Sequence, residues 1–221
     1  MPTVGSQRLL QIAVNQQGSL IHEALCRAGA VAQGDTIAWV SPLASDDYHE
    51  YRDGEALRRL RIVDKLHVPL SSFWPKRGAV WDALALVGNG DPLLVEAKAH
   101  IPEAASRGTR ASAPSRRLID ASLQAARHHL APRSKVVWSE LFYQYANRLA
   151  FQFFLRQQNR IQSRLIFLYF TNATDVGGPA TEEEWHGAIR LIHAVLGLPS
   201  DLRPFAVFEA FLDAASLMHA A

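Results

Sequence analysis

Cysteine and long apolar runs are scarce in this sequence. Cys26 is the only cysteine in 221 residues, which excludes an internal disulfide and a cysteine-based zinc site and fits a reducing compartment best. No stretch approaches the ~20 consecutive apolar residues of a membrane-spanning helix. The first residues also lack the cationic start and apolar core of a signal peptide. We therefore expect a cytoplasmic protein with no membrane partner.

The overall composition is that of a folded globular chain. Hydrophobic residues make up 48% and charged residues 20% of the sequence, an ordinary balance for a protein with a packed core. There is no internal repeat and no long low-complexity tract. The length favours one domain spanning residues 1–221 over two small ones.

Positive charge is concentrated in the middle of the chain. Residues 104–174 contain eleven Lys or Arg and two acids, a balance of +9. The rest of the chain has twelve basic and nineteen acidic residues, a balance of −7, and the two add to the net charge of +2. A basic middle suits a polyanionic partner such as nucleic acid. Pairing of these arginines with acids from elsewhere in the fold explains the pattern equally well.

The order of apolar patterns predicts a mixed α/β fold. We expect a helix over residues 6–31, two strands over 79–87 and 93–100, helices over about 118–130 and 138–158, and a strand over 164–171. A capping box formed by Thr181 and Glu184 predicts a helix that runs to about Leu196, and a last strand is expected over 204–211. Residues 104–117 read as a mobile basic loop. This order predicts an α-β-α sandwich with a central mixed sheet.

Three charged residues fall on the two strands of the expected hairpin. Asp82 lies on the first strand, and Glu96 and Lys98 lie on the second. Residues two apart in a strand share a face at a spacing of about 7 Å, so Glu96 and Lys98 point together and Ala97 points away. An exposed ion pair on an edge strand is the structural alternative. The apolar residues on both sides of Glu96 favour a central strand instead.

Carboxylates and a lysine gathered on a central strand are costly unless something organises them. A Mg²⁺ ion, which prefers carboxylate, carbonyl and water oxygens, would remove the repulsion. It would also polarise a phosphate and acidify a bound water. Lys98 would then orient or deprotonate that water, or stabilise the developing negative charge. This chemistry is phosphodiester hydrolysis.

The segment from Trp81-Asp82 to Leu93-Leu94-Val95-Glu96-Ala97-Lys98 resembles the motif of the PD-(D/E)XK nuclease superfamily, which has a restriction-endonuclease-like fold. Trp81 stands where the family name has proline. The resemblance implies a metal-dependent nuclease that uses Mg²⁺ or Mn²⁺, with DNA favoured over RNA as its substrate. By position, Asp82, Glu96 and the Ala97 carbonyl would bind metal, and Lys98 would serve the attacking water. The family often adds a glutamate from the first helix, which here would be Glu23.

The length of the hairpin loop tests this resemblance. If Asn89-Gly90 were a two-residue turn, Asp82 would lie opposite Ala97 and face away from Glu96. A three-residue loop, Gly88-Asn89-Gly90, places Asp82 opposite Glu96, because one residue of slip reverses the face. The nuclease interpretation therefore predicts a three-residue loop or a bulge.

Several polar residues are candidates for holding nucleic acid. They are Arg107, Arg110, Arg116 and Arg117 in the basic region, and Gln124 on the following helix. Gln144, Arg148 and Gln152 form a polar stripe at helical spacing, for which a solvated surface is the favoured interpretation.

Two rival functions remain open on the sequence alone. One is a non-catalytic nucleic-acid-binding protein on the same fold, and the other is an interaction protein whose charged residues form a solvated ion-pair network. Cutting both strands of a duplex often uses two active sites, so a homodimer is compatible with the nuclease interpretation.

Overall fold

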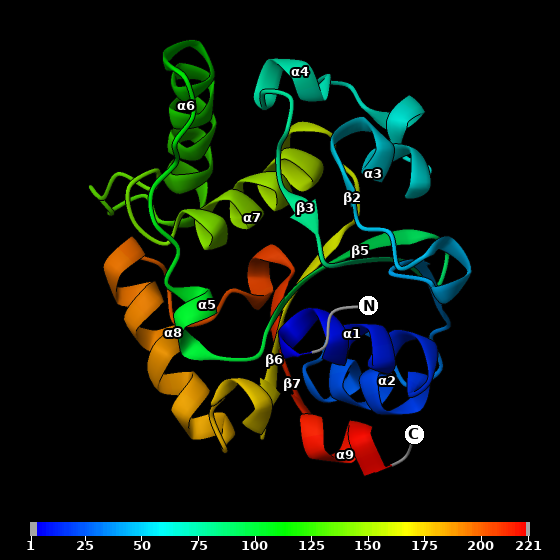
Figure 1. Cartoon of the computed structure of the whole chain (residues 1–221). Helices are drawn as coiled ribbons and strands as arrows, with labels where there is room; N and C mark the ends of the chain where they lie inside the picture. The colour runs from blue at the N-terminus through cyan, green and yellow to red at the C-terminus, as the bar shows by residue number, and fades with distance from the viewer. Residues whose placement is uncertain (1–3, 220–221) are drawn as a thin grey trace.

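The computed structural model describes residues 4–219, and a five-stranded mixed sheet forms its centre (Figure 1). The strands lie in the order β1-β4-β5-β6-β7. β1 pairs with β4 and β4 with β5 antiparallel, whereas β5, β6 and β7 run parallel. Their bounds are β1 (Ile37–Ser41), β4 (Ala83–Val87), β5 (Asp91–Lys98), β6 (Arg164–Thr171) and β7 (Val207–Asp213). The expected mixed α/β class is confirmed.

Helices cover both faces of this sheet (Figure 1). One face carries α1 (Gly5–Asn15), α2 (Gly18–Arg27) and α9 (Ala214–His219). The other carries α7 (Tyr143–Phe153) and α8 (Glu182–Leu196), and α6 (Ala113–Leu130) packs against α7. Shorter elements are α3 (Asp53–Arg59), α4 (Leu70–Phe73), α5 (Ile101–Ala104) and the two-stranded sheet of β2 (Tyr51–Arg52) and β3 (Val80–Trp81). No helix within residues 4–219 is long and apolar enough to cross a membrane.

Strand β5 is central, and its side chains divide between two cores. Val95 and Ala97 belong to the core beneath α1 and α2, whereas Leu94 belongs to the core beneath α6, α7 and α8. Because side chains alternate along a strand, Glu96 and Lys98 also face the α7 side. Every residue of β5 after Asp91 is buried, so the central-strand expectation is confirmed.

The hairpin between β4 and β5 has a three-residue loop, one of the two arrangements that the nuclease interpretation predicts. Val87 pairs with Asp91, which leaves Gly88, Asn89 and Gly90 as the loop. The same register pairs Ala83 with Val95 at the far end. The next pair outward would therefore be Asp82 opposite Glu96.

Several expected boundaries are wrong in detail. The helix expected over 6–31 is two helices, because the chain turns after Asn15 and restarts at Gly18. The basic loop is shorter than 104–117, since α6 already begins at Ala113. The helix expected over 138–158 begins at Tyr143 and ends in a π-helical turn over Phe154–Gln158. The last strand is Val207–Asp213, and a short 3₁₀ turn occupies the residues before it. The capping box at Thr181 is confirmed.

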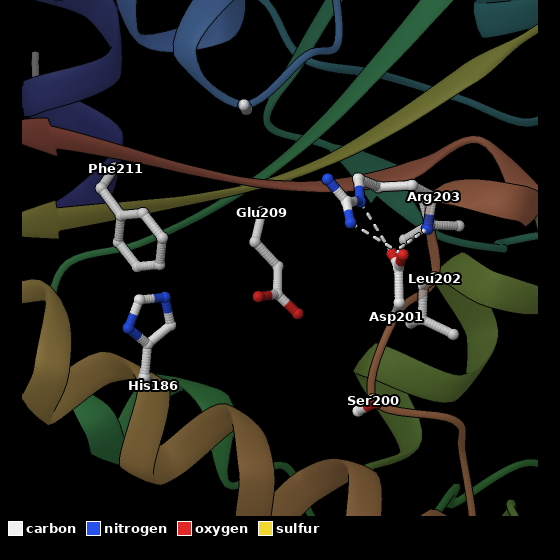
Figure 2. Close-up of a pocket in the computed structure, with 9 residues that line it drawn as sticks. His186, Ser200, Asp201, Leu202, Arg203, Glu209 and Phe211 are labelled. Carbon is white, nitrogen blue, oxygen red and sulfur yellow. Dashed lines mark hydrogen bonds and ion pairs between the residues drawn. The ribbon is translucent and has the colours of Figure 1, made fainter.

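The edge strand β7 borders a pocket of about 270 Å³ beside α8 (Figure 2). Glu209 points into this pocket between His186 and Asp201. Burial, and to a smaller degree the charge of Asp201, raises the pKa of Glu209 to about 7. Behind it, His193 lies 3.6 Å from the Glu209 carboxylate and 2.8 Å from the Tyr145 hydroxyl. These contacts join β7, α8 and α7 on the face that also carries Glu96.

Gly178 makes a close approach that positions the end of β5. A methyl group at this residue would lie 2.1 Å from the Ala99 carbonyl oxygen. Gly187 in α8 has no neighbouring atom within 4 Å of the same position. We predict that Gly178→Ala destabilises the fold by about 1–3 kcal/mol, because the backbone must move to remove the overlap. Gly187→Ala should instead stabilise it by roughly 0.5–1 kcal/mol, because glycine is a poor helix former. Urea unfolding of both variants measures the difference, and equal stabilities would contradict the predicted contact.

Candidate functional site

Asp82 lies at the break between β3 and β4, beside the β5 strand. Its Oδ2 atom accepts a hydrogen bond of 2.7 Å from the Ala97 backbone N–H. In an extended strand the N–H and C=O of one residue point to the same side. The Ala97 carbonyl oxygen is therefore directed to the side of the strand on which Asp82 lies.

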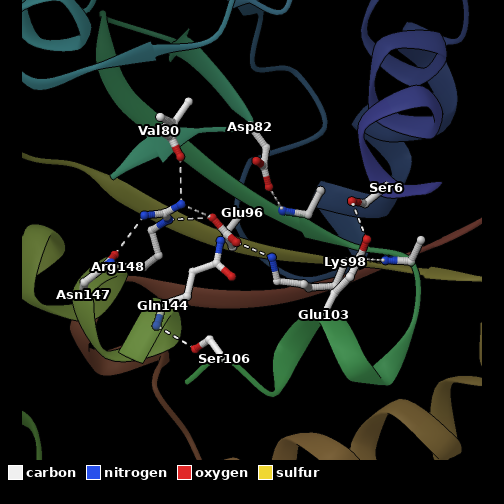
Figure 3. A network of polar contacts seen from close by, with 12 residues as sticks. Ser6, Val80, Asp82, Glu96, Lys98, Glu103, Ser106, Gln144, Asn147 and Arg148 are labelled. Atoms are coloured by element: carbon white, nitrogen blue, oxygen red, sulfur yellow. Dashed lines mark hydrogen bonds and ion pairs between the residues drawn. The ribbon is translucent and has the colours of Figure 1, made fainter. Parts of the chain in front are cut away.

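Glu96 is buried between two cations from different elements (Figure 3). Its Oε1 atom accepts a hydrogen bond from the Lys98 ammonium, and its Oε2 atom accepts one of 2.6 Å from Arg148 Nε. The exposed fraction of the side chain is 1% for Glu96 and 3% for Arg148. The solvated ion-pair network that we considered from the sequence is thus a buried one.

Arg148 is fixed by more than its contact with Glu96. Its Nη2 atom donates to the Val80 carbonyl at 2.7 Å, and its Nη1 atom donates to Asn147 Oδ1 at 2.8 Å. Its guanidinium also lies 4.7 Å from the centre of the Trp81 ring, within the range of a cation–π interaction. Trp81 therefore packs against the arginine that binds Glu96.

The two acids of this site have pKa shifts of opposite sign. Burial, followed by the charge of Glu96, raises the pKa of Asp82 to about 7, although part of its side chain reaches solvent. Burial acts on Glu96 too, but Arg148 and Lys98 outweigh it and hold its pKa below the ordinary value. Asp82 is therefore the acid whose negative charge is poorly compensated.

Glu50 is a third acid near this pair. Its pKa is raised by burial and by the charge of Glu96, against the opposing effects of a hydrogen bond from Gln7 and the charge of Arg148. Gln7, near the start of α1, donates a hydrogen bond of 2.7 Å from its Nε2 atom to the Glu50 carboxylate. With all groups ionised, three acids face two cations, Lys98 and Arg148, and leave a net charge of −1.

The structure does not bring Glu23 to the other candidate site residues. Glu23 is exposed on α2, a helix whose buried side chains pack on the opposite face of the sheet from Glu96. It lines a separate pocket together with His22 and Trp39. Glu50, which precedes β2, is instead the further acid whose pKa burial and the charge of Glu96 raise.

Three of the candidate nucleic-acid contacts are available at the surface. Arg107 and Arg110 are exposed between α5 and α6, and Arg117 is exposed on α6. Within residues 4–219 none of these three forms an ion pair. The loop that carries Arg107 is attached to α7, because Ser106 Oγ accepts the Gln144 backbone N–H at 2.8 Å.

The other two candidates are Arg116, whose guanidinium already has partners, and Gln124, which lines a pocket beside α6. Arg116 is half-buried and pairs with Asp120 at 3.1 Å and with Ser139 Oγ at 3.0 Å, so its role is partly structural. Gln124 is exposed and lines a pocket of about 250 Å³ with Arg127 and other residues of α6 and the following loop.

Sequence reasoning missed Arg148 and Glu50. Arg148 belongs to the stripe interpreted as solvated, but Arg148 and Gln152 are each 3% exposed. The signal was present: between Tyr145 and Leu155 apolar residues lie on most of the helix circumference, which indicates a helix buried nearly all round. Glu50 sits in an acidic turn, and no local pattern separates it from its neighbours.

The oxygen donors at Asp82, Glu96 and Ala97 fit a hard divalent cation in type. The uncompensated charge of Asp82 is the kind of feature that a bound cation would relieve. Within residues 4–219 no group of three His, Cys, Asp or Glu side chains is arranged to hold a metal ion. Such a set nevertheless suits Mg²⁺, which commonly binds through one or two carboxylates and keeps several waters.

Comparison with known proteins adds no relative to this picture. No family model, no curated protein and no solved structure matches the chain.

The raised pKa of Asp82 predicts a pH dependence of stability. Between pH 3.8, its ordinary pKa, and about 7, the folded state retains a proton on Asp82 that the unfolded chain has released. This contribution to stability is therefore lost as pH rises through that window. Relative to wild type, Asp82→Asn should gain about 1–3 kcal/mol of unfolding free energy between pH 4 and pH 8.

The matched control is Asp213→Asn. Burial acts to raise the pKa of Asp213, but hydrogen bonds from Asn172 and Ser216 outweigh it and hold the pKa below its ordinary value, so the effect of this substitution should stay nearly constant between pH 4 and pH 8. Chemical unfolding across this range measures both variants. A constant difference between wild type and Asp82→Asn would refute the predicted ionisation.

Proposed function

We propose that this protein is a divalent-metal-dependent nuclease of restriction-endonuclease-like fold, which hydrolyses DNA phosphodiesters. The observation that carries the proposal is the convergence at the end of the β4–β5 hairpin. There Asp82 accepts the Ala97 N–H, and Glu96 is bonded to Lys98. The three-residue loop and the central position of β5 support the same conclusion.

Asp82, Glu96 and the Ala97 carbonyl would hold the metal, Mg²⁺ or Mn²⁺, with Glu50 in the place that sequence reasoning gave to Glu23. When bound, the cation supplies Lewis-acid polarisation of the phosphate and a more acidic water. Lys98, on the strand next to these donors, would as a cation orient the attacking water and stabilise the developing charge, or in its neutral form accept the proton of that water. Arg148 acts as a positioning residue, because it is fully buried and fixes the Glu96 carboxylate.

Nucleic acid would be held by the exposed arginines of the basic region. Arg107, Arg110 and Arg117 are exposed and form no ion pair within residues 4–219. Guanidinium groups bind phosphate oxygens through paired hydrogen bonds, and release of counterions adds affinity that does not depend on base sequence. The short helix α5 alone separates β5 from the loop that carries Arg107 and Arg110, so these arginines follow the candidate catalytic strand closely along the chain.

A second candidate function is nucleic-acid binding without catalysis. The observation that favours it is that both Glu96 oxygens already accept hydrogen bonds, from Lys98 and Arg148. A carboxylate satisfied in this way binds a further cation less readily. The two functions differ in their response to metal and in whether DNA is cut.

Cleavage of circular DNA tests the catalytic proposal. With Mg²⁺ or Mn²⁺ present, wild type should cut single- or double-stranded circles, and Lys98→Ala should lower the rate about 10²-fold or more. Lys76→Ala is the matched control, because Lys76 is an exposed lysine outside the site and should leave the rate unchanged. Cutting that persists in Lys98→Ala would contradict the assigned role of Lys98. DNA binding without cutting by wild type would favour the second function.

Stabilisation by metal tests the proposed ligands independently of substrate. Mg²⁺ that binds only the folded state must raise its melting temperature. We predict that this rise is lost in Asp82→Ala and reduced in Glu50→Gln but retained in Glu23→Gln, because Glu23 lies on the other side of the sheet. Differential scanning calorimetry with and without Mg²⁺ measures these effects. An unchanged rise in Asp82→Ala, or a loss in Glu23→Gln, would show that the metal binds elsewhere.

A further inference from the structure

The only cysteine of the chain lies beside a histidine on α2. Cys26 Sγ is 3.7 Å from His22 Nδ1, one helical turn away. The other ring nitrogen, His22 Nε2, is 3.0 Å from the Asp35 carbonyl oxygen. A carbonyl oxygen only accepts hydrogen bonds, so this contact assigns the ring proton to Nε2. Nδ1 is then an unprotonated base directed at the thiol.

This pair lines a pocket of about 910 Å³, the largest of the described pockets. Both side chains are half-buried, so the thiol is accessible from the pocket. The walls combine the apolar Ile37 and Trp39 with charged and amide groups, namely Glu23, Arg27 and Gln33. A pocket of this size that combines apolar walls with several polar groups has room for a small peptide-like molecule.

We propose that Cys26 is an activated thiol that forms mixed disulfides with peptide-sized, low-molecular-weight disulfides. A nucleophile, a base within hydrogen-bond reach and a third group that orients the base form the arrangement by which proteins activate cysteine. The three members here are Cys26, His22 and the Asp35 carbonyl. The pair lies on α2, which covers the opposite sheet face from Glu96, and the inference is independent of the proposed nuclease function.

The exchange balances without any further reactant. His22 Nδ1 takes the thiol proton as Cys26 Sγ attacks one sulfur of the small disulfide. The new bond joins Cys26 Sγ to that sulfur as the original sulfur–sulfur bond breaks. The leaving thiolate then takes the proton from His22. Cys26 is oxidised to the disulfide level, and the released sulfur is reduced to a thiol.

Oxidised glutathione is the probe, and the mass of the intact protein reports the adduct. Because the chain has one cysteine, a single adduct identifies Cys26, and Cys26→Ser should form none. We expect His22→Gln to react about tenfold more slowly than wild type near pH 7. The ratio should fall toward one in alkaline buffer, where hydroxide replaces His22 as the base in both proteins.

His186→Gln is the matched control, since His186 lies in the pocket beside β7 and should react like wild type. Equal rates for wild type and His22→Gln at pH 7 would overturn the proposal. So would a rate ratio that stays constant with pH, because altered access to the thiol would act equally at every pH. If His22→Gln does not fold, wild type is compared with free cysteine at pH 7. A faster wild-type reaction supports the proposal, and an equal or slower one overturns it.

Discussion

The burial of the Glu96 carboxylate on the central strand is the constraint on which the rest of the site depends. An ionised carboxylate taken out of water costs several kcal/mol unless charged partners surround it. Lys98 and Arg148 supply those partners from β5 and α7. Arg148 also binds the Val80 carbonyl and lies over Trp81. One buried charge therefore links the sheet, the helix layer and the small sheet of β2 and β3.

That arrangement leaves negative charge uncompensated around the pair. Asp82 and Glu50 have raised pKa values because burial and the charge of Glu96 both act on them. Natural sequences violate local consistency mainly at functional sites. The opposite face of β5 shows no such conflict, since Val95 and Ala97 pack into an apolar core beneath α1 and α2. Because the charged residues of β5 lie on the face toward α7, we place the proposed active site on that side of the sheet.

Local signals in the sequence were reliable where a short range of contacts decides the structure. The Thr181 capping box, the strand at Arg164–Thr171 and the hairpin around Gly88-Asn89-Gly90 follow from local sequence patterns, whereas the length of the hairpin loop was decided only by the structure. The predicted ends of helices were wrong where the local sequence is compatible with either a helix or a loop. The first helix breaks near Gly18, and the basic loop gives way to α6 at Ala113. Propensity alone is a weak guide at such points because tertiary packing selects among them.

The sequence by itself determined that Glu96 and Lys98 share a face, because side chains alternate along any strand. It also determined that a three-residue loop would turn Asp82 to that face. Only the tertiary structure decided that Arg148 and Glu50 join them and that Glu23 does not. Arg148 is 52 residues from Glu96 along the chain, and contacts of that separation depend on how helices pack on the sheet. No periodic pattern in the sequence shows which face of a helix packs on which strand.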